Sequence, residues 1–246
     1  DLTINKSKNP LNKYGKKIFS QSDEDGITIE IIKRINCLNE GIFVELGVGD
    51  GTENNTLILK ALGWKGFWIG NEKLKIDYAN SKDFSYICSF VDLENVVDLL
   101  KKGLSSIGEN LIDVISLDLD GNDYYFLKKI IENNFKPKLF IVEYNAKFPP
   151  PVKWKIEYEK DHKWKGDDYF GASLSTYNDF FEKNGYKLIC CNAHTGANAY
   201  FIKKEFINLF QDVPDEIDDL YMKPRYLLNN YLRFPISIKT INKFFS

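Results

Sequence analysis

The chain has 246 residues, roughly one and a half times the length of a typical domain, so its length predicts one large domain with additions. Its 33 Lys and Arg nearly balance its 35 Asp and Glu, and the net charge of −2 excludes binding to nucleic acid or an anionic membrane through bulk charge. A hydrophobic content of 43% with 15% aromatic residues is enough for a large core and argues against disorder.

Neither membrane insertion nor disulfide bonding is indicated. No apolar run reaches the roughly 18 residues of a spanning helix, and no stretch resembles a signal peptide, so we expect no transmembrane segment. Cys37, Cys88, Cys190 and Cys191 form no Cys-x-x-Cys pair, which argues against a zinc knuckle. The adjacent Cys190 and Cys191 are typical of reduced packing residues, so we expect a cytoplasmic location.

Strands and helices alternate along most of the chain. Polar and acidic residues 22–25 precede isoleucines at helical spacing, which predicts a capped helix. A strand at 41–46 then runs into a glycine turn, after which Thr52 is expected to cap a helix ending near Leu62. Further strands are predicted at 66–69, 86–91, 113–119 and 139–144, and helices at 95–104 and 123–133. This alternation favours a parallel sheet with helices on both faces.

The end of the chain departs from this pattern. Strands at 186–192 and 198–202 are joined by a tight turn at 194–196, which leaves no room for a crossover helix. The fold class predicted is therefore α/β, with a seven-stranded, mostly parallel sheet whose final strand is reversed.

The glycine turn indicates a cofactor. Gly47, Gly49 and Gly51 let the backbone approach a ligand at a helix start, although a plain tight turn has the same composition. Glu72 lies 21 residues after Gly51 at the end of the next strand, a place typical of a ribose-binding acid. Both a dinucleotide and S-adenosylmethionine fit. Glu45 favours the latter, because a carboxylate repels a pyrophosphate and suits the ammonium of a methionine.

Several motifs together resemble a known family. They are residues 19–26 (FSQSDEDG), 43–51 (FVELGVGDG), 63–69 (GWKGFWI), 116–123 (SLDLDGND), 142–145 (VEYN), 171–173 (GAS) and 198–201 (NAYF). In combination they resemble the FkbM-like S-adenosylmethionine-dependent methyltransferases over residues 18 to about 204. The resemblance implies the seven-stranded, Rossmann-like methyltransferase fold and, commonly, O-methylation of sugars or natural products. The chain departs from the family in having Asp120 where glutamate is more usual, and in a long insertion after Asn145.

Carboxylates follow the predicted fourth and fifth strands. Asp118 and Asp120 lie two residues apart, as do Glu143 and Asn145, so each pair shares a face at the carboxyl end of its strand. Four such oxygen ligands suit Mg²⁺ or Mn²⁺, which would lower the pKa of an acceptor hydroxyl. The equally weighted alternative is a turn at Asp120. We expect Asp123 to cap the next helix.

Four other residues are assigned by their expected places. Gln21 is expected to close over the cofactor, and Asp92 to meet the adenine. His194, in the hairpin turn on the ligand side, is a candidate general base or metal ligand, and an exposed turn histidine is the equal alternative. His162, in the insertion, is expected to be a surface or substrate-contact residue.

We divide the chain into a methyltransferase domain (1–204), with residues 146–170 as a lid over the active site, and an appendage (205–246). The lid's aromatic residues and lysines 147, 153, 155, 163 and 165 suit a sugar carrying phosphate, although acids nearly cancel that charge. A lid packed by its own aromatics is the alternative. The acidic 205–220 and basic 221–246 indicate packing or a homo-oligomer contact, with a membrane-surface contact left open.

The leading hypothesis is a methyltransferase acting on a sugar hydroxyl, with the sugar nucleotide-linked or part of a polysaccharide precursor. S-adenosylmethionine would contact Gln21, Glu45, Gly47, Gly49, Glu72 and Asp92, a metal would bind Asp118, Asp120 and Glu143, and Asp120 and His194 would act in catalysis. One alternative is a metal-dependent glycosyltransferase that uses a nucleotide sugar. Another is a nucleotide-binding module without catalytic activity.

Overall fold

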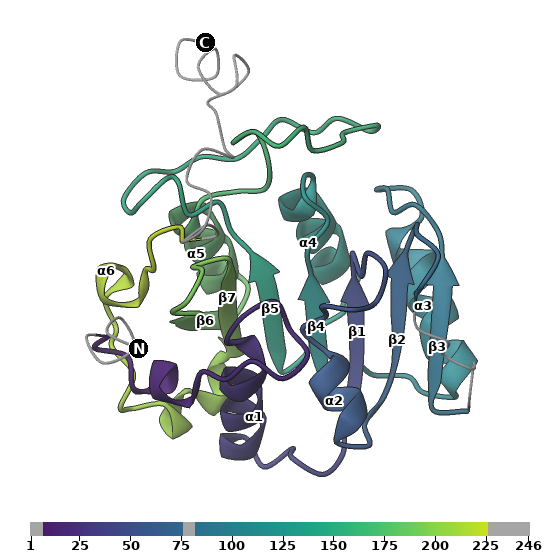
Figure 1. The fold of residues 1–246 in the computed structure, drawn as a ribbon, viewed down its shortest axis with the longest axis horizontal. Helices are drawn as coiled ribbons and strands as arrows, with labels where there is room; N and C mark the ends of the chain where they lie inside the picture. Colours follow the sequence, from purple (N-terminus) through teal and green to yellow (C-terminus); the bar gives the residue numbers. More distant parts are fainter. Residues whose placement is uncertain (1–6, 76–81, 226–246) are drawn as a thin grey trace.

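The computed structural model describes residues 7–75 and 82–225, which form a seven-stranded sheet (Figure 1). The strands are β1 (Ile42–Leu46), β2 (Lys65–Gly70), β3 (Phe84–Cys88), β4 (Val114–Leu117), β5 (Leu139–Glu143), β6 (Tyr186–Cys191) and β7 (Asn198–Lys203). Their order is β3-β2-β1-β4-β5-β7-β6. Strands β1 to β5 pair in parallel, and β7 is antiparallel to both neighbours, β5 and β6. The predicted fold class, with its reversed final strand, is confirmed.

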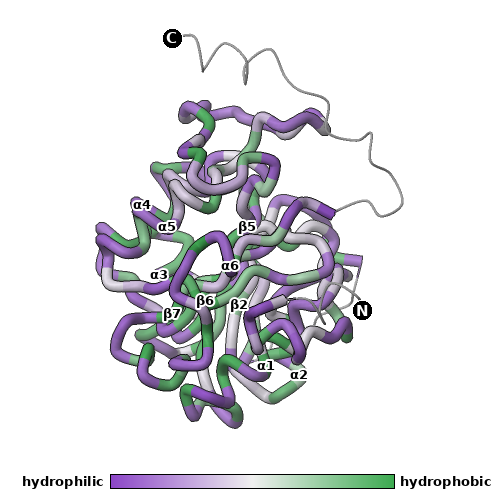
Figure 2. The backbone as a smooth tube through the Cα atoms, turned by 90° about the vertical axis from the view of Figure 1, so that its left-hand side faces the viewer, coloured by the Kyte–Doolittle hydropathy of each residue, from purple (hydrophilic) through white to green (hydrophobic). Residues whose placement is uncertain are grey.

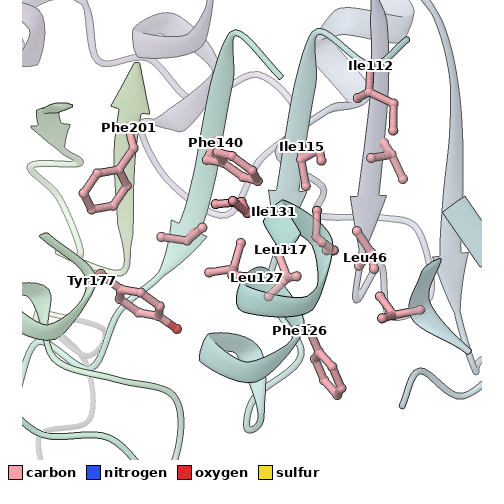
Figure 3. Close-up of a cluster of buried hydrophobic side chains, with 14 of the residues drawn as sticks. Leu46, Ile112, Ile115, Leu117, Phe126, Leu127, Ile131, Phe140, Tyr177 and Phe201 are labelled. Carbon is pink, nitrogen blue, oxygen red and sulfur yellow. The ribbon is translucent and has the colours of Figure 1, made fainter. Parts of the chain in front are cut away.

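Helices cover both faces of the sheet, because the strands alternate apolar residues between two cores. One core lies under α3 (Val96–Ile107), α4 (Asp123–Glu132) and α5 (Leu174–Lys183), and the other under α1 (Glu24–Arg34) and α2 (Leu57–Ala61). Figure 3 shows the first core, where Leu127 and Ile131 of α4 lie over Ile115 and Leu117 of β4 and Phe140 of β5.

Two elements start elsewhere than predicted. Helix α2 begins at Leu57 rather than just after Thr52, because the preceding N–H groups bind a side chain from β1, as described below. Strand β3 begins at Phe84 and ends at Cys88, whereas 86–91 was predicted. Phe84 belongs to the strand because its ring packs edge-on against Trp68, with ring centroids 5.2 Å apart.

The acidic run at the start of α1 binds other segments of the chain instead of capping its own helix. Asp23, Glu24 and Asp25, which we call the helix-start cluster, are fully buried. The N-cap residue Asp23 makes no side-chain bond to the helix, so the predicted capping is wrong. Its carboxylate accepts hydrogen bonds from the N–H groups of Ala193 (2.9 Å) and His194 (3.1 Å). The Glu24 carboxylate accepts one from Asn192 Nδ2 at 2.9 Å. Asp25 Oδ2 accepts three from the backbone N–H groups of Ile18, Phe19 and Ser20, at 2.7, 2.6 and 2.9 Å.

The insertion at 146–170 crosses above the carboxyl ends of the strands in Figure 1, and in the turned view of Figure 2 it forms the upper layer of the molecule. It has a small core of its own, made of Phe148, Trp154, Ile156 and Tyr169. The rings of Phe148 and Trp154 are stacked with centroids 4.4 Å apart. Its aromatic residues therefore pack largely on one another.

The described part of the predicted appendage, residues 205–225, packs on the main body. It contains η3 (Lys204–Leu209) and α6 (Ile217–Leu220), and a third short helix, η2 (Pro10–Tyr14), lies near the N-terminus. Leu220 is 1% exposed, and the Tyr221 hydroxyl donates to the carbonyl of Ala146 at 2.6 Å. The expected oligomer contact falls mostly on residues 226–246, which lie outside the described residues.

All four cysteines are free thiols, and only Cys88 is exposed. Within residues 7–75 and 82–225, no helix combines the length and the apolar character needed to cross a membrane.

Candidate active site

Three carboxylates meet where β4 and β5 end, and we call them the strand-end cluster. Asp118 and Asp120 follow β4, and Glu143 is the last residue of β5. One carboxylate oxygen from each lies within 4.8 Å of the others, so the predicted set of three comes together. The predicted fourth member, Asn145, does not join them. Its Nδ2 instead donates to two carbonyl groups of the insertion, at 2.9 and 3.1 Å.

The strand-end cluster is short of positive charge. Burial and the charge of Asp120 raise the pKa of Asp118, and burial and the charge of Asp118 raise the pKa of Glu143. Loss of water around the carboxylate and the nearby Asp123 raise the pKa of Asp120 to about 6. Asp118 and Glu143 share a hydrogen bond. Such a group of carboxylates takes up either a proton or a cation.

The turn that carries Asp120 is held by Asp123, the first residue of α4. Its Oδ1 accepts a hydrogen bond from the Leu119 N–H and its Oδ2 accepts one from the Gly121 N–H, each at 2.8 Å. Asp123 therefore fixes the turn before the helix, and the predicted capping role is wrong. Asp120 itself has a φ of 53°, which brings its side chain back toward the strand ends.

The two glycines proposed for the cofactor differ in what they permit. Gly47 has a φ of 90°, and a Cβ there would lie 1.6 Å from the carbonyl oxygen of Asp118. Only glycine lets these two backbone segments approach so closely. A Cβ on Gly49, by contrast, would meet no atom within 4 Å. The backbone at Gly49 is therefore open to a ligand.

The predicted residues line a cavity of about 540 Å³ at the carboxyl ends of the strands. Its lining includes Gln21, Glu45, Gly47, Gly49, Glu72, Asp118, Asp120 and Glu143. A smaller cavity of about 170 Å³ shares Gly47, Gly49, Glu72, Asp118 and Asp120 with it and extends to residues 89–91. Together they form one elongated site. Gln21 reaches it from the loop before α1 rather than from the helix itself.

Glu45 has a role that the sequence did not indicate. Its Oε1 accepts a hydrogen bond from the Asn55 N–H at 2.9 Å, and its Oε2 accepts from the Thr56 N–H at 3.0 Å and the Thr56 hydroxyl at 2.6 Å. This carboxylate thus supplies the acceptors at the start of α2, where we expected Thr52. Burial raises its pKa.

Two predicted residues lie outside the linings of both cavities. Asp92 accepts hydrogen bonds from the N–H groups of Glu94 (2.8 Å) and Asn95 (2.9 Å), so it fixes the turn before α3. His194 is exposed in the β6–β7 loop. His162 is the opposite case: its side chain is 7% exposed and lines the smaller cavity, where it packs against Gly121.

Other lining residues were not predicted. Trp164 and Phe170 reach the main cavity from the insertion, with ring centroids 6.0 Å apart. Asn55 donates from its Nδ2 to the Ser116 hydroxyl at 3.2 Å. Asn198 lies opposite Glu143 in the antiparallel register of β7 and β5. Asn198 could have been found from the sequence, because the predicted reversed strand begins at this residue, beside the fifth strand. Trp164 and Phe170 could not, because their positions depend on the path of the insertion.

A comparison with protein-family models found no match, and a comparison with curated proteins found none either. Among solved structures, the chain is similar to CalO1, a methyltransferase in calicheamicin biosynthesis in its SAH-bound form, at 12% identity and a TM-score of 0.40 over 72% of this chain and 56% of that one. It is also similar to an O-methyltransferase family 2 protein from Planctomyces limnophilus DSM 3776 in complex with apigenin, at 10% identity and a TM-score of 0.38 over 66% of this chain and 51% of that one. A third similar structure is a fibrillarin/Nop5p complex, at 12% identity and a TM-score of 0.36 over 66% of this chain and 72% of that one. The match thus spans only about half the length of the first two proteins.

Proposed function

We propose that the chain is an S-adenosylmethionine-dependent O-methyltransferase of the FkbM-like type that transfers a methyl group to a sugar hydroxyl. The observation that carries this proposal is the shared cavity, in which the glycine turn and Glu72 lie beside the strand-end cluster. Ligands of open α/β sheets bind beyond the carboxyl ends of the strands, which is where this cavity lies. The motifs quoted above support the same activity.

The cofactor would lie along the two joined cavities. Gln21, Glu45, Gly47 and Gly49 line the end suited to the methionine part, and Glu72 suits the ribose. Residues 89–91 and His162 line the smaller cavity, which suits the adenine. Asp92 contributes only indirectly in this arrangement, by fixing the turn that follows Val91.

The chemistry would be a direct displacement. The acceptor oxygen would attack the methyl carbon while the carbon–sulfur bond breaks, and the electron pair of the broken bond would go to sulfur to give S-adenosylhomocysteine. The hydroxyl proton passes to a carboxylate. Asp120 suits this step, because a base with a pKa of about 6 is ionised at neutral pH and still accepts a proton readily. His194 has no part in this scheme, since it does not line the site.

The same carboxylates suit a hard divalent cation. Three carboxylate oxygens within 4.8 Å match the ligands of Mg²⁺ and Mn²⁺. Beside them the Tyr177 hydroxyl is buried with no hydrogen-bond partner among the described residues, and burial, followed by the charges of Asp123, Glu143 and Asp118, raises its pKa. Figure 3 shows it on the side toward which β5 points. When bound, the ion would lower the pKa of the acceptor hydroxyl; Asp118, Asp120 and Glu143 would hold it.

The test is calorimetric titration of S-adenosylhomocysteine, with and without Mg²⁺ or Mn²⁺, and of NADH as a control. We expect micromolar binding of S-adenosylhomocysteine and no response to NADH. Glu72→Ala should weaken binding about tenfold, because it removes a charge-assisted hydrogen bond to the ribose. The matched control is Asp98→Ala, whose side chain is 81% exposed on α3 and should bind like the wild type.

Absence of S-adenosylhomocysteine binding would overturn the proposal. If a uridine diphosphate sugar then bound in a Mn²⁺-dependent manner, the strand-end cluster would favour the glycosyltransferase alternative. Cofactor binding without methylation of any acceptor, together with an unchanged Asp120→Asn variant, would favour the module without catalytic activity.

A further inference from the structure

The main cavity has a one-sided charge. Its described lining contains seven carboxylates and no Lys or Arg. They are Glu45, Asp50, Glu53, Glu72, Asp118, Asp120 and Glu143. A cavity lined by one sign of charge attracts ligands of the opposite sign and repels those of the same sign.

Only two of these charges are balanced by the protein. Asp50 pairs with Lys75 at 2.7 Å and Glu53 with Lys17 at 3.6 Å, and both lysines lie outside the lining. The other five carboxylates form no ion pair with any Lys or Arg of the described chain. When ionised, these five carboxylates carry more negative charge than a divalent cation and the positively charged cofactor together supply.

The lysines that the sequence suggested for phosphate binding lie elsewhere. Lys147 pairs with Asp168, Lys153 pairs with Asp179, and Lys155 donates to the Tyr125 hydroxyl at 2.8 Å. Lys163 and Lys165 are exposed. None of the five lines either cavity, so the insertion brings no Lys or Arg to the site.

What the insertion does bring is apolar surface. Trp164 and Phe170 line the main cavity, and the Trp164 ring N–H donates to the Asp167 carbonyl at 2.7 Å, which fixes the ring. Ring faces of this kind pack on the apolar face of an uncharged ring compound, while the surrounding carboxylates accept its hydroxyl hydrogens.

We propose that the acceptor carries no phosphate or other anionic group. It is an uncharged or amine-bearing hydroxyl compound, such as a simple glycoside, rather than a nucleotide-linked sugar. This inference rests on the proposed methyl transfer and narrows its substrate class.

The first test compares matched acceptors. Glucose, galactose, mannose and rhamnose are each offered as the methyl glycoside, the 1-phosphate and the nucleoside diphosphate derivative, and formation of S-adenosylhomocysteine is followed with and without Mn²⁺. Like charges that face each other in a binding site cost several kcal/mol of binding free energy, and about 1.4 kcal/mol corresponds to a tenfold change in affinity. We therefore expect the phosphate-free member of each set to be methylated at least about tenfold faster than its phosphorylated counterparts. Equal or better use of a phosphorylated member would overturn the inference.

A second test does not depend on the sugar. Pyrophosphate is titrated into the protein loaded with S-adenosylhomocysteine, with and without Mn²⁺, and we expect no binding. Glu53→Lys should weaken the repulsion and so raise the affinity for pyrophosphate relative to the wild type, whereas Asp98→Lys on the surface of α3 should not. Micromolar pyrophosphate binding by the wild type would overturn the inference. Failure of S-adenosylhomocysteine to load would instead overturn the proposed methyl transfer, so the two failures are distinguishable.

Discussion

Two groups of three carboxylates lie in this molecule, the first fully buried and the second partly exposed, and the protein treats them differently. In the helix-start cluster, Asp23, Glu24 and Asp25 each accept hydrogen bonds from N–H groups of other segments. In the strand-end cluster, Asp118 and Glu143 share a hydrogen bond with each other, and no N–H group of the described residues donates to any of the three carboxylates. Each acid of the first cluster thus has donors from the protein, although Asp25 Oδ1 has none, whereas the second cluster remains available to a ligand.

The comparison teaches that the supply of hydrogen-bond donors distinguishes structural from functional acids. A buried carboxylate with enough donors stabilises the fold, while one without donors costs stability unless something else binds it. The four predictions below test this difference, from the largest expected effect to the smallest.

Asp120→Asn should lower methyl transfer by about a hundredfold or more, because it removes the base or a cation ligand while keeping the shape of the side chain. Binding of S-adenosylhomocysteine should change by no more than about twofold, since the reacting groups contribute little to ground-state affinity. Turnover assays and calorimetry on the same preparation measure both quantities. An equal loss of cofactor binding would contradict the assignment of the strand-end cluster.

Asp25→Ala should lower the free energy of unfolding by about 3 kcal/mol, because three N–H groups lose a charged acceptor. Denaturant unfolding measures the change, with Asp98→Ala on the surface as the control. A loss no larger than that of the control would mean that water replaces the carboxylate and that the helix-start cluster is not structural.

Glu143→Gln should change stability in the opposite direction. Removing one of three mutually repelling carboxylates should raise the free energy of unfolding of the ligand-free protein by about 1 kcal/mol, at the expense of activity. Urea titration without divalent cations is the measurement. Destabilisation by this variant would place Glu143 with the structural acids.

The stability of the wild type relative to Asp120→Asn should also depend on pH. The pKa of Asp120 is raised from an ordinary value of 3.8 to about 6, so the folded state holds its proton more tightly than the unfolded state. The wild type should therefore lose stability relative to the variant as pH rises from 3.8 to about 6, by about 1 kcal/mol after solvent screening. Thermal unfolding of both proteins across this range measures the difference, and a constant difference would contradict the shifted pKa.

The sequence predicted those features that depend on local pattern. Alternating strands and helices predicted the parallel sheet, the short connection at 194–196 predicted the reversed β7, and the spacing of Asp118, Asp120 and Glu143 predicted their convergence. All three follow from periodicity and from the shared edge at which parallel strands end.

Features that depend on distant partners were not predictable in the same way. Glu45 resembles a ligand contact in the sequence, yet its oxygens serve α2, and Asp123 serves the turn behind it. The acids before α1 look like helix caps, but their donors include Asn192 and its neighbours. A short-range pattern shows where an acid is, not which N–H group will reach it.

The bond between Asp23 and the β6–β7 loop also has a consequence for biosynthesis. Asp23 and Ala193 are 170 positions apart, so most of the domain must leave the ribosome before the distant donors for Asp23 and Glu24 exist. Until then the amino-terminal segment carries charged groups that it cannot bury at acceptable cost. The nascent chain should therefore stay open and protease-sensitive at this end until its last hairpin emerges, after which both ends close in one cooperative step.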